Sequence, residues 1–180
     1  MSVLIEGISV VVRTETLKEK FPGGVVAYCL DCPNKTFCSD GRLTRVGFMV
    51  PNDVGFFVRC LQKQGLLWVD PEKRFRDVAV VDQLSGPTST CDWLVYERQI
   101  DGPAYAWQTG TEPGELAVPR DWCYEESLSK DFVYTPKKGA DRWRAAEGHR
   151  DGCDLYIHPR TGRKSACARP FGPDVVGLPE

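Results

Sequence analysis

Histidine is scarce in this sequence of 180 residues, which contains only His149 and His158. Histidine is the side chain that most often transfers protons near neutral pH, and it is a common ligand of transition metals. A nucleophilic thiol such as Cys91 would also need a neighbouring base. Gly23-Gly24 is not a phosphate-binding P-loop, and no other motif is specific for one reaction. We therefore expect a protein that binds rather than catalyses, with a zinc-dependent or metal-independent enzyme of unknown reaction as an alternative.

The sequence also lacks a long hydrophobic run and a surplus of charge of either sign. Its apolar runs are far shorter than the roughly 20 residues that span a bilayer. Met1-Ser2-Val3-Leu4-Ile5-Glu6 has no basic residue before its apolar ones, unlike a secretory signal. Lys and Arg number 23 against 25 Asp and Glu, so the net charge of −2 creates no general attraction for nucleic acid or an anionic membrane. We expect a cytoplasmic protein without a membrane partner.

The residues that are present have the composition of an ordinary globular protein, 42% hydrophobic and 27% charged. The length suits a single domain over residues 1–180. Aromatic residues are numerous, with five Trp, six Tyr and eight Phe. Such residues line small-molecule pockets and anchor protein interfaces. The expected partner is therefore a small molecule or, as an alternative, another protein that this one inhibits, and the oligomeric state stays open.

Eight cysteines are present, but the chain is neither short nor preceded by a secretory signal, so we expect reduced thiols. Cys29, Cys32 and Cys38 have the spacing C-x2-C-x5-C, which invites comparison with a zinc site. A zinc site needs four ligands, usually as two close pairs, and no second C-x2-C exists. We expect Cys29 and Cys32 to pack as small apolar residues on a helix face, with zinc as the alternative, and no resident cofactor.

Residues 43–97 form the stretch with the clearest pattern. It predicts a strand, a helix and three further strands, over residues 43–50, 53–64, 66–69, 77–82 and 92–97. The helix presents one apolar face at a 3.6-residue period, through Val54, Phe57, Val58 and Leu61. Asn52 or Asp53 can cap its first turn, and Gly65 can end it in a left-handed conformation.

This order of elements resembles one βαβββ module of the glyoxalase/bleomycin-resistance (vicinal oxygen chelate) superfamily. The resemblance rests on Arg45-Val46-Gly47-Phe48-Met49-Val50-Pro51 before the helix and on Cys91-Asp92-Trp93-Leu94-Val95-Tyr96 at the end. Metal-using members carry a His on the first strand and a Glu near the end of the last strand. Arg45 and Val95 stand at those positions here, and neither has a donor atom for a metal. The resemblance thus implies a module without the family's metal.

The segments on either side favour an α+β protein with a mixed or antiparallel sheet and two or three helices on one face. Before the central unit, we expect a strand over residues 5–13 and a short helical turn that is capped by Thr14 or Thr16 and broken at Pro22-Gly23-Gly24. A second helix from about residue 23 to 31 follows, and then a loop or tight hairpin over residues 36–42 with Asp40-Gly41 as its turn. After it, residues 100–169 read as a strand-rich extension, with strands at 104–108, 115–118 and 132–134, a helical turn at 121–126 and a closing hairpin at 154–169. An irregular tail fills 170–180.

A polar turn between two expected strands is the candidate binding site. Residues 82–92 gather donors and acceptors at one end of the sheet, where ligands often meet loops. The residues predicted to bind a small molecule are Arg45, Asp82, Gln83, Thr88 and Asp92, with Arg45 available for an anionic group. The alternative is an ordinary hairpin whose hydroxyls bond the turn backbone.

The stretch 141–150 is the most basic part of the chain, and Trp143 lies between two arginines. Aromatic and basic residues together can bind nucleic acid by stacking and neutralisation. Asp141, Glu147 and Asp151 dilute this charge. We therefore favour a solvated strand or turn with Trp143 in the core over a nucleic-acid site.

Overall fold

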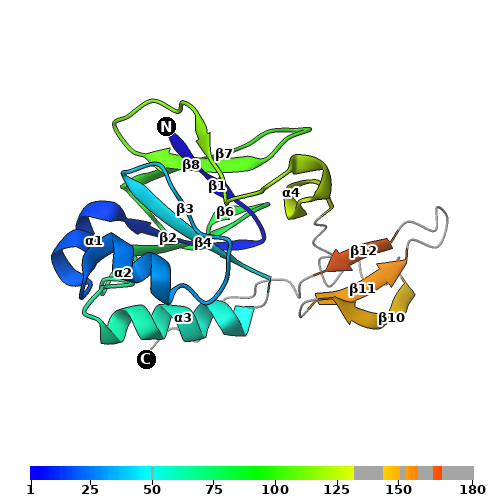
Figure 1. Cartoon of the computed structure of the whole chain (residues 1–180), viewed down its shortest axis with the longest axis horizontal. Helices are drawn as coiled ribbons and strands as arrows, with labels where there is room; N and C mark the ends of the chain where they lie inside the picture. Colours follow the sequence, from blue (N-terminus) through cyan, green and yellow to red (C-terminus); the bar gives the residue numbers. More distant parts are fainter. Residues whose placement is uncertain (50, 132–143, 151–152, 158–163, 168–180) are drawn as a thin grey trace.

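The computed structural model describes residues 1–49, 51–131, 144–150, 153–157 and 164–167. It has the expected α+β class, with antiparallel and mixed sheets, and α1, α2 and α3 lie together on one side of the central sheet while α4 lies apart (Figure 1). The helices are α1 (Thr14–Lys20), α2 (Gly24–Asp31), α3 (Pro51–Lys63), α4 (Leu128–Asp131) and the 3-10 turn η1 (Tyr124–Glu126). None of these helices is long and apolar enough to cross a membrane.

A five-stranded antiparallel sheet forms the centre of the molecule, in the order β3-β4-β2-β5-β6. Its strands are β2 (Ile8–Arg13), β3 (Cys38–Ser39), β4 (Leu43–Phe48), β5 (Val78–Asp82) and β6 (Gly86–Pro87). On β2, Val10 is paired with Val46 on one side and with Val80 on the other. All three side chains are fully buried, as β-branched residues in a central strand require.

A four-stranded sheet lies next to it, in the order β7-β8-β1-β9. Its strands are β1 (Ser2–Ile5), β7 (Leu94–Arg98), β8 (Ala104–Gln108) and β9 (Leu116–Ala117). β1 pairs antiparallel with β8 and parallel with β9, and its side chains are all buried. In Figure 1 this sheet lies on the opposite side of the central sheet from α1, α2 and α3. The strands expected at 104–108 and 115–118 are confirmed.

The single strand expected at 5–13 is wrong, because the chain bends at Glu6-Gly7 and divides it into β1 and β2, which belong to different sheets. Gly7 has a φ of +54°, in the left-handed region that glycine tolerates. A Cβ at this position would lie 2.5 Å from the backbone oxygen of Phe48, so no other residue fits without a backbone shift. The apolar pattern runs through the bend, which is why periodicity alone did not predict it.

The three expected helices of the first half are confirmed with changed starts. α3 begins at Pro51 rather than at residue 53, because proline suits the first helical position, where its missing N–H is not needed. Gly65 ends α3 with a φ of +94°, and the Leu66 N–H donates to Leu61 O at 3.2 Å. The predicted threonine cap of α1 is wrong: Arg13 occupies the cap position and no side chain caps the helix.

The stretch 43–97 contains the expected first strand, helix and 77–82 strand, but the pairing adds a strand from outside it. β2 lies between β4 and β5 and pairs with both. The strand expected at 66–69 is reduced to one bridge between Val69 and Phe75, and β7 pairs with β8 in the other sheet. The likeness to a glyoxalase module stays a prediction.

The second half ends in a three-stranded antiparallel sheet formed by β10 (Arg144–Arg150), β11 (Cys153–Ile157) and β12 (Lys164–Cys167). The pairing of β11 with β12 confirms the hairpin expected at 154–169. The helical turn expected at 121–126 is present as η1. The predictions for residues 132–134, for Trp143 and for the tail 170–180 lie outside the described residues.

Candidate functional site

Arg45, the residue expected to bind an anionic group, is buried in the interior with an exposed fraction of 1%. Its Nε donates to Ser9 Oγ at 2.8 Å, its Nη1 to Thr36 O at 3.1 Å and its Nη2 to Glu6 O at 2.9 Å. Burial lowers the pKa of this guanidinium. Its hydrogen bonds go to the protein itself, so the guanidinium ties β4 to the bend between β1 and β2 and to the loop before β3.

Gly47 makes the burial of this guanidinium sterically feasible. It lies two residues after Arg45 on the same face of β4. A Cβ on Gly47 would lie 2.3 Å from Arg45 Nη2, and the three hydrogen bonds of the guanidinium hold it in that place. The Arg-Val-Gly sequence is therefore a packing motif in this fold.

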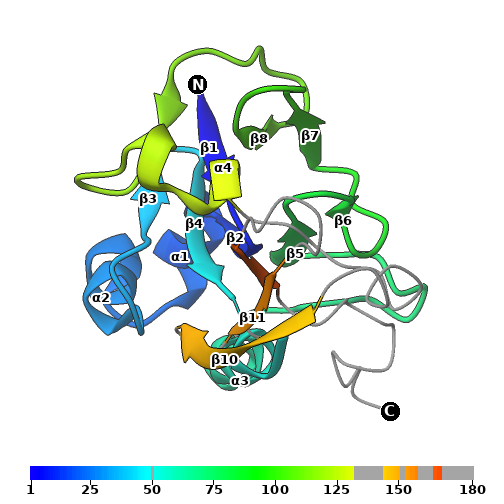
Figure 2. The same cartoon turned by 90° about the vertical axis from the view of Figure 1, so that its right-hand side faces the viewer.

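Gln83 is also buried, and it binds the same bend from the other side. The Gly7 N–H donates to Gln83 Oε1 at 2.7 Å, and Gln83 Nε2 donates to Leu128 O at 3.1 Å. Glu6 Oε1 accepts hydrogen bonds from Trp122 Nε1 at 2.9 Å and from Ser129 Oγ at 2.6 Å. We call this group of Glu6, Gly7 and their hydrogen-bond partners the polar corner. Both views place α4 near the end of β1, where the corner lies (Figures 1 and 2).

The other three predicted residues shape or flank the turn after β5. Asp82 is buried and accepts hydrogen bonds from the N–H groups of Leu84 and Ser85, at 2.8 and 2.9 Å. The Thr88 hydroxyl donates to Val80 O at 3.1 Å, as in the ordinary hairpin that was the alternative. Asp92 is exposed. The structure therefore joins Arg45 and Gln83 through one backbone segment, Glu6-Gly7. Of the five residues, Gln83 alone lines either of the two hollows found among the described residues.

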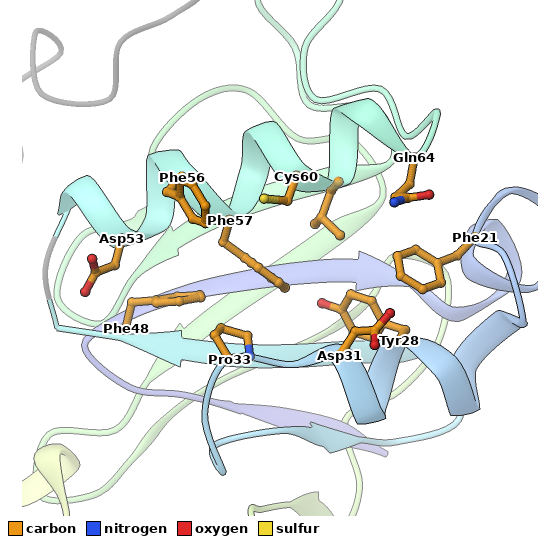
Figure 3. A pocket seen from close by; sticks show the side chains of 11 residues that line it. Phe21, Tyr28, Asp31, Pro33, Phe48, Asp53, Phe56, Phe57, Cys60 and Gln64 are labelled. Carbon is orange, nitrogen blue, oxygen red and sulfur yellow. The ribbon is translucent and has the colours of Figure 1, made fainter.

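A hollow lined by aromatic rings lies elsewhere, between α2 and α3 above the end of β4 (Figure 3). Its volume is about 280 Å³. We call it the aromatic groove; it is lined by Phe21, Tyr28, Asp31, Pro33, Phe48, Asp53, Phe56, Phe57, Cys60, Leu61 and Gln64. The residues come from α2, α3, β4 and three loops, so no single stretch of sequence contains the groove.

The rings of the groove pack edge to face or tilted, as aromatic side chains prefer. The centroids of Phe21 and Tyr28 are 5.5 Å apart at 87°, and those of Phe48 and Phe57 are 5.2 Å apart at 44°. Tyr28 and Phe57 join the two pairs, with centroids 6.1 Å apart. This continuous floor is held by the core, whereas Phe56 at its edge is 65% exposed.

Tyr28 brings an unusual hydroxyl to the groove. The residue is 1% exposed, and its hydroxyl has no hydrogen-bond partner among the described residues. The Thr44 hydroxyl lies beside it; it donates to Val12 O at 3.3 Å and lowers the pKa of Tyr28 against the larger effect of burial. Burial raises the pKa of Tyr28 well above its ordinary value, so the hydroxyl is neutral and keeps its proton. Figure 3 shows the ring reaching from α2 into the space beneath α3.

The charged side chains that line the groove are both acidic. Asp31 closes α2 and Asp53 stands in the first turn of α3. Both are exposed, and within the described part of the chain neither forms an ion pair. Figure 3 shows Asp53 near Phe48 at one end of the groove and Asp31 beside Tyr28 farther along it. The groove therefore combines an apolar floor with a negative rim.

A second cavity, of about 360 Å³, lies beside the polar corner and is lined mainly by polar groups. Gln83 and Ser129, which line it, already bind the corner through their side chains. Of its two basic residues, Lys130 is paired with Glu125, while Arg98 is exposed and accompanied by Asp101. Its polar groups thus either bond within the protein or face solvent, and we consider it a weaker candidate for a ligand site than the groove.

The three cysteines of the C-x2-C-x5-C spacing, of which Cys29 and Cys32 were expected to pack on a helix face, lie in three environments. Cys29 is exposed, which makes the packing prediction wrong for it, whereas Cys32 is half-buried and Cys38 is buried. Burial, with the nearby Cys29 and Asp31, raises the pKa of Cys32 to about 12. Burial likewise raises the pKa of Cys91 to about 11. Among residues whose side chains are described, no cluster of metal-ligating groups is found.

Comparison with protein-family models, with curated proteins and with solved structures finds no match. The account of the site thus rests on its geometry. Prediction from sequence missed the aromatic floor because its rings are contributed by residues 21, 28, 48 and 57, which lie in different elements. The one available signal was the abundance of aromatic residues, which does not say where they meet.

Proposed function

We propose that this protein is a binding protein whose aromatic groove takes a small molecule with an apolar or aromatic body. The observation that carries the proposal is the continuous floor formed by Phe21, Tyr28, Phe48 and Phe57, open to a hollow of about 280 Å³. Ligand sites are commonly concave and apolar with a few polar groups, and this hollow is at the small end of their size range. We propose this groove rather than the turn at residues 82–92, whose buried Asp82 and Gln83 already bond within the protein.

The groups that line the groove support binding rather than catalysis. Besides the rings and the apolar Pro33 and Leu61, they are two carboxylates, one amide and one thiol, at Asp31, Asp53, Gln64 and Cys60. A nucleophile needs an adjacent base that raises its reactivity, and these side chains supply no histidine or lysine for that purpose. We place the protein in the cytosol, where its thiols stay reduced.

A protein partner is the second candidate, and it is favoured by apolar side chains exposed on the same helices. Val26 and Leu30, four residues apart on α2, have exposed fractions of 72% and 80%, and Phe56 on α3 has 65%. Exposed apolar residues that gather on one surface commonly mark interfaces. A partner could cover these residues and insert one side chain into the groove.

The test is binding of 2-phenylethanol to the protein and to a variant whose groove is filled. Cys60 is half-buried and lines the groove, so Cys60→Phe places a ring in the space the ligand would use. We expect calorimetric or NMR titration to show binding to the original chain and at least a tenfold loss in Cys60→Phe. The matched control is Cys123→Phe at an exposed cysteine away from the groove, which should bind normally.

Thermal unfolding of both variants shows whether each is folded. Saturable binding that is unchanged in a folded Cys60→Phe would contradict the proposal, as would the absence of any binding to the original chain. If a partner protein is instead the natural ligand, Leu30→Asp should abolish that association while leaving 2-phenylethanol binding intact.

A further inference from the structure

We propose that the natural ligand of the aromatic groove is an organic cation, a small molecule that carries an ammonium or similar positive group on an apolar or aromatic body. This inference rests on the proposed function, since it specifies the ligand of the same site. It is carried by the coincidence of the aromatic floor with the two carboxylates of Asp31 and Asp53 and with a lining that contains no basic residue.

Helical periodicity explains why both carboxylates face the rings. Asp31 follows Tyr28 by three residues on α2, and Asp53 precedes Phe57 by four residues on α3. Side chains three or four apart lie on one face of a helix. α2 therefore presents one ring and one carboxylate to the hollow, α3 presents two rings and one carboxylate, and Figure 3 shows both carboxylates on its border.

The rings add to the attraction that the carboxylates create. The face of an aromatic ring carries partial negative charge, so a cation held against it gains energy even at a partly exposed site. Four rings close to one another offer several such faces, and a desolvated cation gains more than a solvated one. A neutral ligand of the same shape would gain only the apolar contact.

The two carboxylates differ in their helical surroundings, which gives the inference a finer prediction. Asp31 is the last residue of α2, where the free carbonyl groups of the helix add negative potential. Asp53 stands in the first turn of α3, where the free N–H groups add positive potential and weaken the pull on a cation. Asp31, beside Tyr28, is therefore expected to contribute more to cation binding than Asp53.

The experiment compares three probes of similar shape and different charge: 2-phenylethylammonium, 2-phenylethanol and 3-phenylpropanoate, each titrated into the full chain at low and at physiological salt. We expect the ammonium to bind about tenfold more tightly than the alcohol, and the carboxylate most weakly. The preference for the ammonium should shrink as salt rises, because ions screen exposed carboxylates.

Conservative variants identify the groups responsible. Asp31→Asn should weaken binding of the ammonium about fivefold and Asp53→Asn about twofold, while neither changes the affinity for the alcohol. Asp92→Asn is the matched control, because Asp92 is exposed and does not line the groove. It should leave all three affinities unchanged.

The outcomes separate this inference from the function on which it rests. Equal affinity for the ammonium and the alcohol, or tighter binding of the alcohol, would overturn the cation inference and leave an apolar binding site. Failure of all three probes to bind would overturn the proposed function and this inference together. Preference for the ammonium that survives unchanged in a folded Asp31→Asn, Asp53→Asn double variant would overturn the assignment to these carboxylates.

Discussion

The polar corner and the aromatic groove differ in whether their polar groups have hydrogen-bond partners within the protein. In the corner, charged and amide groups such as Arg45 and Gln83 are buried and bonded to the protein's own backbone. In the groove, rings and carboxylates face an open hollow, and the buried hydroxyl of Tyr28 has no partner among the described residues. Groups that already have partners hold the fold, whereas groups that still lack them can bind something else.

The comparison predicts that changes in the corner alter stability and changes in the groove alter binding. The corner joins both sheets, because Glu6-Gly7 connects β1 to β2 and Gln83 follows β5. The groove lies on the outer layer, where substitution of an exposed side chain disturbs few neighbours.

The largest effect is expected from Arg45→Ala. The change removes the three hydrogen bonds of the guanidinium: Thr36 O loses this donor, and Glu6 O keeps the Ser9 hydroxyl at 3.0 Å. Together with the cavity, this loss should lower the free energy of unfolding by about 3–5 kcal/mol. Chemical denaturation measures it. The control is Arg42→Ala, at an exposed arginine in the neighbouring turn, which should change the free energy of unfolding by less than about 0.5 kcal/mol. Similar losses in the two variants would show that the polar corner does not stabilise the fold.

A smaller effect is expected from Gly7→Ala. The left-handed φ of +54° costs an alanine about 1–2 kcal/mol, and the clash of its Cβ with Phe48 O at 2.5 Å adds a backbone shift. We expect a total loss of about 2–4 kcal/mol. Gly41 has a φ of +89° with no atom within 4 Å of its ideal Cβ, so Gly41→Ala isolates the conformational part. Equal losses in the two variants would mean that close packing at the bend is unimportant.

The smallest effect on stability, and a clear effect on binding, is expected from Phe56→Ala. The side chain is 65% exposed, so the free energy of unfolding should change by less than about 0.5 kcal/mol. Affinity for 2-phenylethylammonium should fall about threefold, because one wall of the groove is lost. Leu67→Ala, at another exposed apolar residue that does not line the groove, should leave the affinity unchanged. Unaltered affinity in Phe56→Ala would exclude that wall from the site.

Local patterns predicted the parts of the fold whose causes are local. The apolar face of α3, its stop at Gly65 and the Asp40-Gly41 turn are all read from neighbouring residues, and all are present. The Asp40 carboxylate accepts a hydrogen bond from the Leu43 N–H at 2.7 Å, as a turn residue should. The bend at Gly7 was missed because its cause is the distant Phe48 backbone.

The candidate site could be predicted less well, for a physical reason. Arg45, Asp82 and Gln83 stand out in the sequence because they are polar residues near apolar strands, and burial of such residues demands internal partners. Asp82 bonds the turn that directly follows it, but Arg45 and Gln83 bond the bend at Glu6-Gly7, which is distant in the sequence, and no spacing reveals that contact. The rings at 21, 28, 48 and 57 resemble ordinary core residues until the fold shows that they border a hollow.

The most direct test of this account is an NMR titration that records the backbone amide shifts of the full chain as 2-phenylethylammonium is added. We predict that the amides of α2 and α3 and of residues near Phe21 and Phe48 shift together with one dissociation constant, while those of Glu6, Gly7 and residues 82–88 do not move. Shifts confined to residues 82–92 and the polar corner, with α2 and α3 unaffected, would contradict the division between a structural corner and a binding groove.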